Sequence, residues 1–254
     1  MCLILYKPAS SKIPFEIFQN VILRNKDGFG IMYQNKQKHT IQIHKTQNCN
    51  VDEHWNIYKE HQDKDVVLHW RHRTEGDVSL ENAHPFEVIK DKLYMVHNGA
   101  IHNKLPHTES DTNKNPSDTH IFIETLLKPL SNSTNLIDLI ENSPQFRLML
   151  ASTIGNSNKL VFMTPDKIVP INHFETTDEK YVAEIQGLFY SNTYAWDNQN
   201  WLIKKPESFP NNFSRSFKPG QKHRNNRLTV VSEAPTQTLT QMKVSKILRT
   251  CYNS

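Results

Sequence analysis

The sequence predicts an α+β fold in which strands and helices are segregated into separate layers. Two observations carry this prediction. Segments with strand and helix patterns follow the order strand, helix, several strands, several helices and several strands, without the regular alternation of parallel α/β proteins. The chain also has 254 residues, 37% of them hydrophobic, which is enough for one large domain with a sizeable core.

The first hundred residues contain apolar runs of strand length that are separated by polar stretches. Leu3–Tyr6 is the first of these runs, so an early buried strand is expected. Further strands are expected at 28–33 and 40–44, as a hairpin, and at 66–71 and 92–97. Pro14 precedes apolar residues at helical spacing and predicts a helix that reaches Arg24. A second helix is expected over 51–60.

The second half begins with a polar segment at 102–116 that is typical of a loop. Ser117 or Asp118 then supplies an N-cap for a helix that extends to Leu127, and two shorter helices are expected at 136–140 and 146–151. Thr164-Pro-Asp-Lys167 is a strong turn signal between predicted strands at 160–163 and 168–171. The last strand is expected over 187–193.

The C-terminal segment differs in composition from the rest of the chain. Pro, Asn and Ser become frequent after Trp201, hydrophobic periodicity ends, and from Ser208 onward eight cationic residues stand against Glu233 alone. We therefore expect a folded domain over 2–203 and a basic low-complexity tail over 204–254. Within this tail, 205–235 is typical of a disordered linker and 234–252 is compatible with a short helix.

Composition excludes several classes of protein. Three cysteines, at 2, 49 and 251, form neither a disulfide framework nor a CxxC pair, which favours a reduced, cytoplasmic location. The sequence has no signal-peptide pattern and no run of about 18 apolar residues, so no membrane partner is expected. The histidines form no HExxH pattern, and we expect neither a metal nor any other cofactor.

Cys2 is a candidate nucleophile that would carry its own base. Removal of the preceding Met leaves Cys2 with a thiol and a free α-amine, and an amine of ordinary pKa, about 7.7–8.0, is partly unprotonated near neutral pH. Activation of a nucleophile by such an amine is an established arrangement. The alternative is a cysteine at position 2 without a chemical role.

Four short blocks accompany Cys2. They are Arg24-Asn-Lys-Asp-Gly-Phe-Gly30; Arg71-His-Arg-Thr-Glu-Gly76 with Asn82-Ala-His-Pro-Phe86; His97-Asn-Gly99; and Ser117-Asp118-Thr119. In this order they resemble the class II glutamine amidotransferase domain, an N-terminal-nucleophile hydrolase, over about residues 2–200. The resemblance implies a four-layer αββα sandwich of two antiparallel sheets between helical layers, and the order of the predicted segments is compatible with that fold.

The resemblance also implies catalytic and substrate-binding roles. Cys2 attacks the carboxamide carbon of glutamine, while the Asn98 amide and the Gly99 N–H form the oxyanion hole, for which neutral donors are suited. Arg71 binds the α-carboxylate through its planar fork, and Asp118 binds the α-ammonium. Taken alone, Asn98-Gly99 is also typical of a hairpin turn, and Asp118 is also typical of a helix N-cap. A functional role and a purely structural role therefore both stay open for these residues.

Five further residues match the family's motifs. Thr74 and Gly76 lie in the same segment as Arg71 and are expected to add substrate contacts. Arg24, Asp27 and Gly30 match residues that support the nucleophile. A plain glycine-containing loop would explain the last three equally well.

Two positions depart from the common pattern of the family. Leu3 follows Cys2 at a position where Gly is most frequent in the family. This departure concerns the subtype within the family and leaves the resemblance to the family itself unchanged. Glu75 stands where His is more frequent, and it changes the charge near the substrate. The chain resembles compact, stand-alone members of bacteria and phages.

The predicted function is therefore the release of ammonia from glutamine through a γ-glutamyl thioester. The expected partners are glutamine and a separate synthase subunit that accepts the ammonia. One alternative is a stand-alone hydrolase of another γ-glutamyl amide. The other is a non-catalytic module whose basic tail binds nucleic acid, because aromatic and cationic residues alternate over 213–218 and cations cluster over 222–227.

Overall fold

Two antiparallel sheets form the centre of the protein. The computed structural model describes residues 1–101, 115–172 and 188–192. Sheet A has the strand order β3-β2-β4-β1-β9, and sheet B has the order β5-β6-β7-β8. The strands of sheet A are β1 (Leu3–Lys7), β2 (Phe29–Asn35), β3 (Thr40–Thr46), β4 (Val66–Trp70) and β9 (Phe189–Tyr190). Those of sheet B are β5 (Phe86–Ile89), β6 (Leu93–Asn98), β7 (Lys159–Met163) and β8 (Ile168–Ile171).

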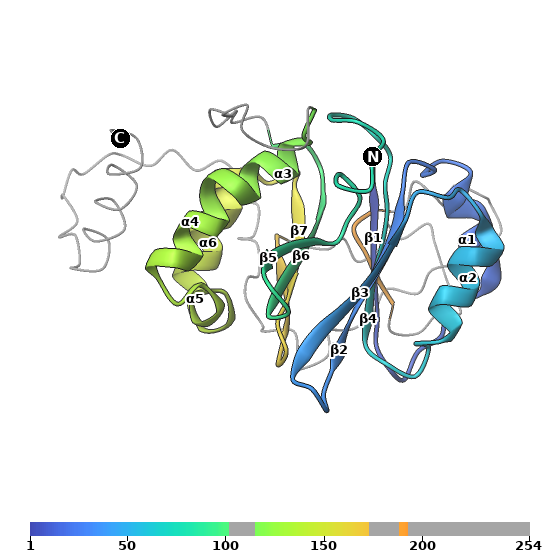
Figure 1. Ribbon diagram of the computed structural model, residues 1–254, viewed down its shortest axis with the longest axis horizontal. Coiled ribbons are helices and arrows are strands. Elements are labelled where there is room, and N and C mark those ends of the chain that lie inside the picture. The colour runs from blue at the N-terminus through green and yellow to red at the C-terminus, as the bar shows by residue number, and fades with distance from the viewer. Residues whose placement is uncertain (102–114, 173–187, 193–254) are drawn as a thin grey trace, which may run out of the picture. The chain divides into compact units, whose positions relative to one another are not determined.

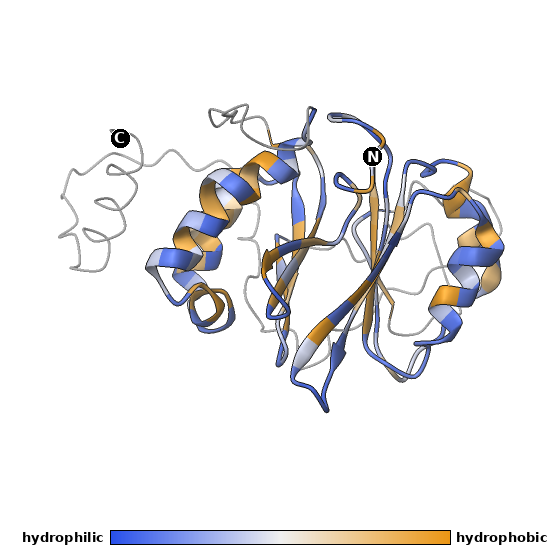
Figure 2. Cartoon of the chain, viewed as in Figure 1, coloured by the Kyte–Doolittle hydropathy of each residue, from blue (hydrophilic) through white to orange (hydrophobic). Residues whose placement is uncertain are grey.

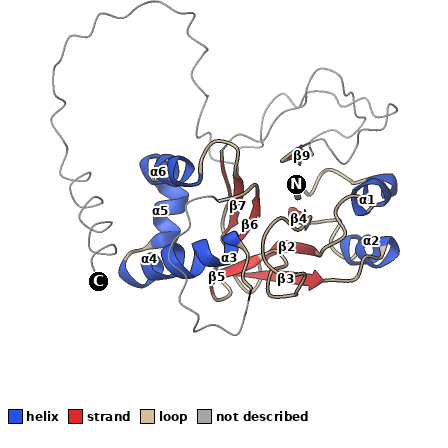
Figure 3. Cartoon of the chain, turned by 90° about the horizontal axis from the view of Figure 1, so that it is seen from above, coloured by secondary structure: helices blue, strands red, loops and turns tan. Residues whose placement is uncertain are grey.

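Helices cover the outer face of each sheet (Figures 1 and 3). Two helices pack on sheet A: α1 (Phe15–Ile22) and α2 (Val51–Lys59). The other helical segments pack on sheet B: α3 (Asp118–Phe122), the π-helical turn η1 (Ile123–Leu127), α4 (Lys128–Ser133), α5 (Leu136–Asn142) and α6 (Pro144–Ile154). In Figure 2 hydrophobic and hydrophilic residues alternate around these helices, because one face of each is buried against a sheet.

Three layers of hydrophobic core separate the four layers of secondary structure. β1 contributes side chains to two of these core layers. Leu3 and Leu5 pack toward α1 and α2, whereas Ile4 and Tyr6 pack between the sheets. Successive side chains of a strand point to opposite faces, so a strand covered on both faces is apolar throughout. Burial of each such side chain contributes about 1.5–3 kcal/mol. The expected α+β fold and αββα layering are confirmed.

The predicted elements agree with the structure except at a few places. β5 was not predicted, because Pro85 precedes it and charged Glu87 interrupts a run of only four residues. The strand expected over 187–193 is reduced within the described residues to Phe189 and Tyr190, although Ser191 N still donates to the Ile4 carbonyl of β1 at 2.9 Å. Residues 102–114 of the loop expected over 102–116, the linker over 205–235 and the helix over 234–252 lie outside the described residues.

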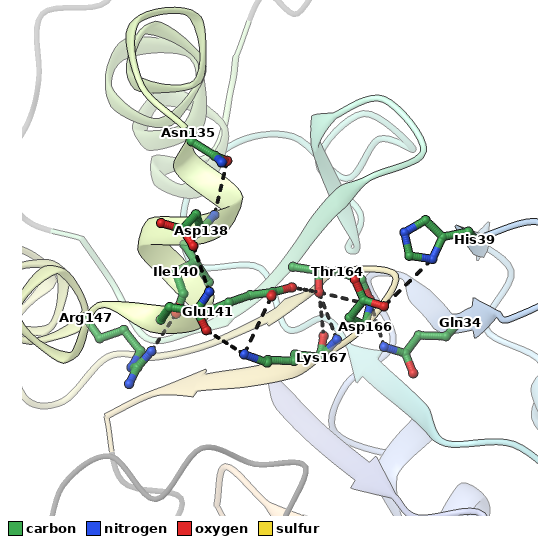
Figure 4. A network of polar contacts seen from close by, with 11 residues as sticks. Gln34, His39, Asn135, Asp138, Ile140, Glu141, Arg147, Thr164, Asp166 and Lys167 are labelled. Carbon is green, nitrogen blue, oxygen red and sulfur yellow. Dashed lines mark hydrogen bonds and ion pairs between the residues drawn. The ribbon is translucent and has the colours of Figure 1, made fainter.

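A polar network closes the end of the sandwich opposite Cys2 (Figure 4). The side-chain amide of Gln34, on β2, donates to the main-chain oxygen of Thr164 at 2.8 Å. The Thr164 hydroxyl in turn donates to the Glu141 carboxylate of α5, and Lys167 lies 3.7 Å from the same carboxylate. The predicted 164–167 turn therefore joins sheet A, sheet B and a helix. No helix in the part of the chain that the structure describes is long and apolar enough to cross a bilayer.

Candidate active site

Cys2 lies immediately before β1, at the end of a central strand. Its sulfur lies 3.4 Å from both the main-chain nitrogen and the main-chain oxygen of His72. Two asparagines hold the main chain on either side of it: Asn25 donates to the Met1 carbonyl at 2.8 Å, and Asn192 donates to the Cys2 carbonyl at 2.7 Å. The position of the thiol is thus fixed by segments that are far apart in the sequence.

Burial raises the pKa of the Cys2 thiol. The main-chain hydrogen bond from His72, the positive N-terminus and Arg71 act in the opposite direction, and the Asp118 carboxylate raises this pKa further. A thiol with a raised pKa is protonated near neutral pH and is a poor nucleophile. An α-ammonium on Cys2 itself would lie closer to the sulfur than one on Met1 and would favour the thiolate.

Five of the residues predicted to act in catalysis or substrate binding line one hollow: Cys2, Arg71, Thr74, Gly99 and Asp118. The same hollow is lined by His72, Glu75, His84, His97, Ser117 and Thr119. Sheet A contributes the nucleophile and the arginine, while the end of β6 and the start of α3 contribute the other side. A cation, an anion and a thiol therefore face one space.

Arg71 follows β4, and the residue is almost completely buried at 3% exposure. One terminal nitrogen donates to the Asp77 carbonyl at 2.6 Å and the other donates to the Glu75 carbonyl at 2.9 Å. Burial lowers the pKa of Arg71, while nearby Cys2 and Asp27 raise it. Because a guanidinium stays protonated in proteins, Arg71 is a cation held by its own loop, with further N–H groups for a ligand carboxylate.

Asp118 is the first residue of α3, and the N-cap of that helix is Ser117. The Ser117 hydroxyl accepts from His120 N at 3.2 Å, so the capping function does not fall on the Asp118 side chain. One Asp118 oxygen accepts from Ile101 N at 2.6 Å and the other from Thr119 N at 2.7 Å. A carboxylate has about four acceptor positions, so room for an ammonium group remains.

β6 ends at Asn98 and Gly99 follows it; Gly99 lines the hollow, whereas Asn98 does not. The Asn98 amide donates to the Ser191 hydroxyl at 2.7 Å, while its own oxygen is buried without a hydrogen-bond partner in the described parts of the chain. Gly99 has φ +143°, and a Cβ there would lie 2.1 Å from the side-chain oxygen of Asn158. Only glycine fits this position, and it places the main-chain turn directly on Asn158.

Asn158 determines the protonation of the neighbouring His97 ring. Its Nδ2 donates to the carbonyls of Ala100 and Ile154, so its Oδ1 must be the atom 2.8 Å from His97 Nε2. Nε2 therefore carries a proton, and the neutral ring accepts at Nδ1 from the Thr119 hydroxyl, 2.7 Å away. Burial lowers the pKa of His97, which favours this neutral form.

The predicted supporting residues connect the Arg71 loop to the strand that follows the first helix. Asp27 N donates to the Arg71 carbonyl at 3.1 Å, and its carboxylate accepts from Arg73 N at 2.7 Å. A Cβ on Gly30 would lie 1.9 Å from the His84 carbonyl, so only glycine allows these segments to approach. Arg24 is exposed, and its carbonyl lies 3.1 Å from His72 Nδ1.

Gly76 does not line the hollow. It has φ +74°, and a Cβ there would lie 2.7 Å from Ser117 N, so this glycine lets the Arg71 loop pack against the start of α3. The loop is also held by Asn82, whose amide donates to the carbonyls of Asp77 and Asn115 and whose oxygen accepts from Ser117 N at 2.9 Å. Gly76 thus shapes the site through its backbone.

Several residues of the site were not predicted as site residues, among them Asn25, His84, Asn158 and Ser191. Asn25 and His84 lie inside the quoted motifs, where their burial was the missing information. Asn158 and Ser191 lie in no motif, and each reaches the site only through the pairing of distant strands. In the described ranges no three His, Cys, Asp or Glu side chains are arranged to hold a metal ion.

Comparison with known proteins gives a family for this chain. The family described as "Glutamine amidotransferases class-II" matches residues 3–163. A curated relative, a probable glutamine–fructose-6-phosphate aminotransferase (isomerizing) of Acanthamoeba polyphaga mimivirus, is 24% identical over 163 residues. That match covers 57% of this chain and 27% of the relative, so the chain spans about a quarter of the relative's length.

Two solved structures show similarity at low identity. A glutamine phosphoribosylpyrophosphate amidotransferase from B. subtilis, complexed with ADP and GMP, is 15% identical with a TM-score of 0.44, and covers 80% of this chain and 44% of that one. A glutamine aminotransferase class-II domain protein from Silicibacter pomeroyi is 14% identical with a TM-score of 0.34, and covers 66% of this chain and 74% of that one. The family match extends over more than half of the chain, from β1 to the end of β7, and on this ground the protein belongs to the class II glutamine amidotransferases.

Proposed function

We propose that this protein hydrolyses the side-chain amide of glutamine, with Cys2 as the nucleophile once the residue before it is removed. The observation that carries the proposal is the placement of the Cys2 thiol, the Arg71 guanidinium and the Asp118 carboxylate around one hollow. A free amino acid carries one α-carboxylate and one α-ammonium. Charges of opposite sign in one small space suit such a substrate.

The chemistry follows from these groups. The Cys2 thiolate attacks the carboxamide carbon, and the Gly99 N–H and the Asn98 amide stabilise the oxyanion that forms. The α-ammonium of Cys2 gives a proton to the nitrogen, the C–N bond breaks, and ammonia leaves a γ-glutamyl thioester. Water then attacks the thioester, with the α-amine as base, and glutamate and the free thiol are released.

The Asn98 amide supports this role after a rotation of its plane. The Asn98 oxygen has no partner in residues 1–101, 115–172 and 188–192, whereas its nitrogen donates to Ser191. A half-turn of the amide lets the Ser191 hydroxyl donate to the oxygen and releases both N–H groups for an oxyanion. Amide orientation of this kind is set by the hydrogen-bond network.

The acceptor of the ammonia is part of the same proposal. We infer that a separate synthase receives it, and the curated relative supports this, since its name describes an aminotransferase that uses glutamine. The second candidate is a stand-alone hydrolase of another γ-glutamyl amide, which the Glu75 side chain in the lining of the hollow favours because it adds negative charge near the substrate. Rates with and without a co-purified synthase distinguish the two.

A direct test compares the wild-type protein with Cys2→Ala and Cys2→Ser. Wild-type protein, shown by intact mass to lack Met1, is expected to release ammonia from glutamine and to be labelled once by a diazoketone analogue of glutamine. Both variants lose these activities by at least about 100-fold, because no thiolate remains. Cys49→Ala serves as the matched control, since Cys49 is exposed and away from the site. Met-free wild-type protein with neither ammonia release nor labelling would contradict the proposal.

A further inference from the structure

His84 is a buried histidine that has no hydrogen-bond partner on either ring nitrogen within the ranges that the structure describes. Its residue is 4% exposed, and it lines the same hollow as Cys2 and Asp118. Nearly all buried polar atoms of folded proteins are paired, because an unpaired one is costly. A buried imidazole with two free nitrogens at the wall of a pocket therefore indicates a missing polar partner.

The surroundings of His84 keep its ring neutral. It packs on the His69 ring at a centroid distance of 3.9 Å and meets the Phe86 ring edge-to-face at 4.6 Å. Burial holds the pKa of His84 well below its ordinary value, and the neighbouring His69, His97, Arg71 and Lys45 lower it further. A neutral imidazole offers one N–H donor and one acceptor.

The other groups around the hollow leave one part of an amino-acid substrate for His84 to bind. The charged ends of an amino-acid substrate correspond to Arg71 and Asp118, and its amide oxygen corresponds to the Gly99 N–H. The amide nitrogen, with two N–H donors, is then the group without an acceptor. His84 is a neutral acceptor in the same space, and it matches a neutral donor better than either charged end of the substrate does.

We propose that His84 accepts a hydrogen bond from the carboxamide nitrogen of the substrate and makes the site selective for primary amides. The inference rests on the proposed function and extends it from the acyl part of the substrate to its leaving group. During acylation the C–N bond breaks, its electron pair stays on nitrogen, and the proton that completes ammonia comes from the Cys2 α-ammonium. His84 transfers no proton and holds the nitrogen in place as it leaves.

Binding measured in a Cys2→Ala background tests this proposal without turnover. The two probes are glutamine and the γ-methyl ester of glutamate, which keeps the carbonyl and both charged ends but replaces NH₂ with OCH₃. We expect glutamine to bind about ten-fold more tightly than the ester, as a site built around an N–H group rejects an analogue that lacks it. With His84→Phe in the same background the two probes bind equally.

Stability provides a second readout that separates this role from a structural one. His84→Phe keeps a flat ring against His69 and Phe86 and removes two unpaired polar atoms, so the urea midpoint of unfolding is expected to stay the same or rise. His54→Phe is the matched control. His54 is equally buried and stacks on Phe29, but its Nε2 lies 2.7 Å from the Asn48 carbonyl. Its replacement lowers the midpoint and leaves the preference for glutamine unchanged.

The outcomes are distinct. A preference for glutamine over the ester that survives His84→Phe overturns the inference, even when wild-type protein releases ammonia, and so does a lower urea midpoint with an unchanged preference. Absence of ammonia release from Met-free wild-type protein overturns the proposed function and the inference together. Loss of the preference with a retained midpoint supports the assignment. His84→Gln, which again carries an acceptor, then restores part of the preference.

Discussion

At the scale of single residues, two buried asparagines hold the two ends of the site. Asn158 bonds to Ala100 and His97, on either side of the proposed oxyanion donor Gly99. Asn82 instead holds the loop that carries Arg71 and the residue before Asp118. The two side chains are alike in burial, so they provide a matched pair for separating catalysis from binding.

Asn158→Ala is expected to lower kcat for glutamine about 10- to 100-fold with little change in KM, because the turn that presents the Gly99 N–H loses its support. Asn82→Ala is expected to raise KM with a smaller effect on kcat, since it loosens the groups that bind the charged ends. Each variant leaves buried groups unpaired and loses about 1–3 kcal/mol of stability. Steady-state kinetics on folded protein measures kcat and KM for both variants. If the two variants changed kcat and KM to the same extent, the assignment of Asn158 to catalysis and of Asn82 to binding would be refuted.

The sequence predicted the chemistry-bearing residues better than the residues that position them. Cys2, Arg71, Gly99 and Asp118 lie in compact motifs, and the structure brings them to one hollow. Asn158 could not be found in this way, because its contacts arise from the pairing of β6 with β7, sixty residues apart in the chain. An isolated asparagine carries no sequence signal for a partner at that distance.

At the scale of elements, β9 is the shortest of the described strands, and the residue that follows it, Ser191, reaches the site. Ser191, directly after it, accepts from Ile4 N at 2.9 Å and from the Asn98 amide at 2.7 Å. Its main-chain oxygen accepts from the buried Lys159 side chain. One residue thus connects β1, β6 and β7 close to the nucleophile.

Ser191→Ala is expected to destabilise the protein by about 1–3 kcal/mol, because the Ile4 N–H loses a buried acceptor and the Asn98 side chain loses its hydrogen-bond partner. It should also lower kcat for glutamine, since Asn98 loses the group that orients it. Urea unfolding and ammonia release measure the two effects. Ser152→Ala is the control: its hydroxyl bonds only to Leu148 O one turn earlier on exposed α6, and a change above about 0.5 kcal/mol there would question the comparison.

Sequence patterns located the longer elements and missed features that depend on tertiary pairing. The strands at 66–70 and 93–98 are mostly apolar, and they were predicted within one or two residues. β5 depends instead on its partner β6, with which Phe86 and Glu87 pair, and its own four residues give a weak signal. The π-helical turn η1 was also not predicted. Over five residues, the spacing of apolar residues in a π-helical turn cannot be told from that in an α-helix.

At the scale of the whole molecule, buried neutral histidines make stability depend on pH. Burial lowers the pKa of His69 to about 3, below the value of about 6.5 in an unfolded chain. The unfolded state therefore binds a proton between these values that the folded state does not. The stabilising contribution is complete above about pH 6.5 and is lost as the pH falls toward 3.

His69 alone is expected to reduce the free energy of unfolding by about 2 kcal/mol between pH 7 and pH 5. His84 and His97, whose pKa values are also lowered, add to the same trend. Urea unfolding at several pH values measures the slope, and His69→Phe is expected to reduce it. His44→Gln, at an exposed position on β3, should leave the slope unchanged, and an equal change in both variants would contradict this account.

The division of the active site between the two sheets has a consequence for the evolution of this chain. Cys2 and Arg71 belong to one half of the sandwich, and Gly99 and Asp118 to the other, so their distances are set by the apolar layer in which Met32 and Val96 meet. A repacking of that layer shifts the reacting groups apart without replacing any of them. Selection for turnover therefore acts on side chains that never meet the substrate.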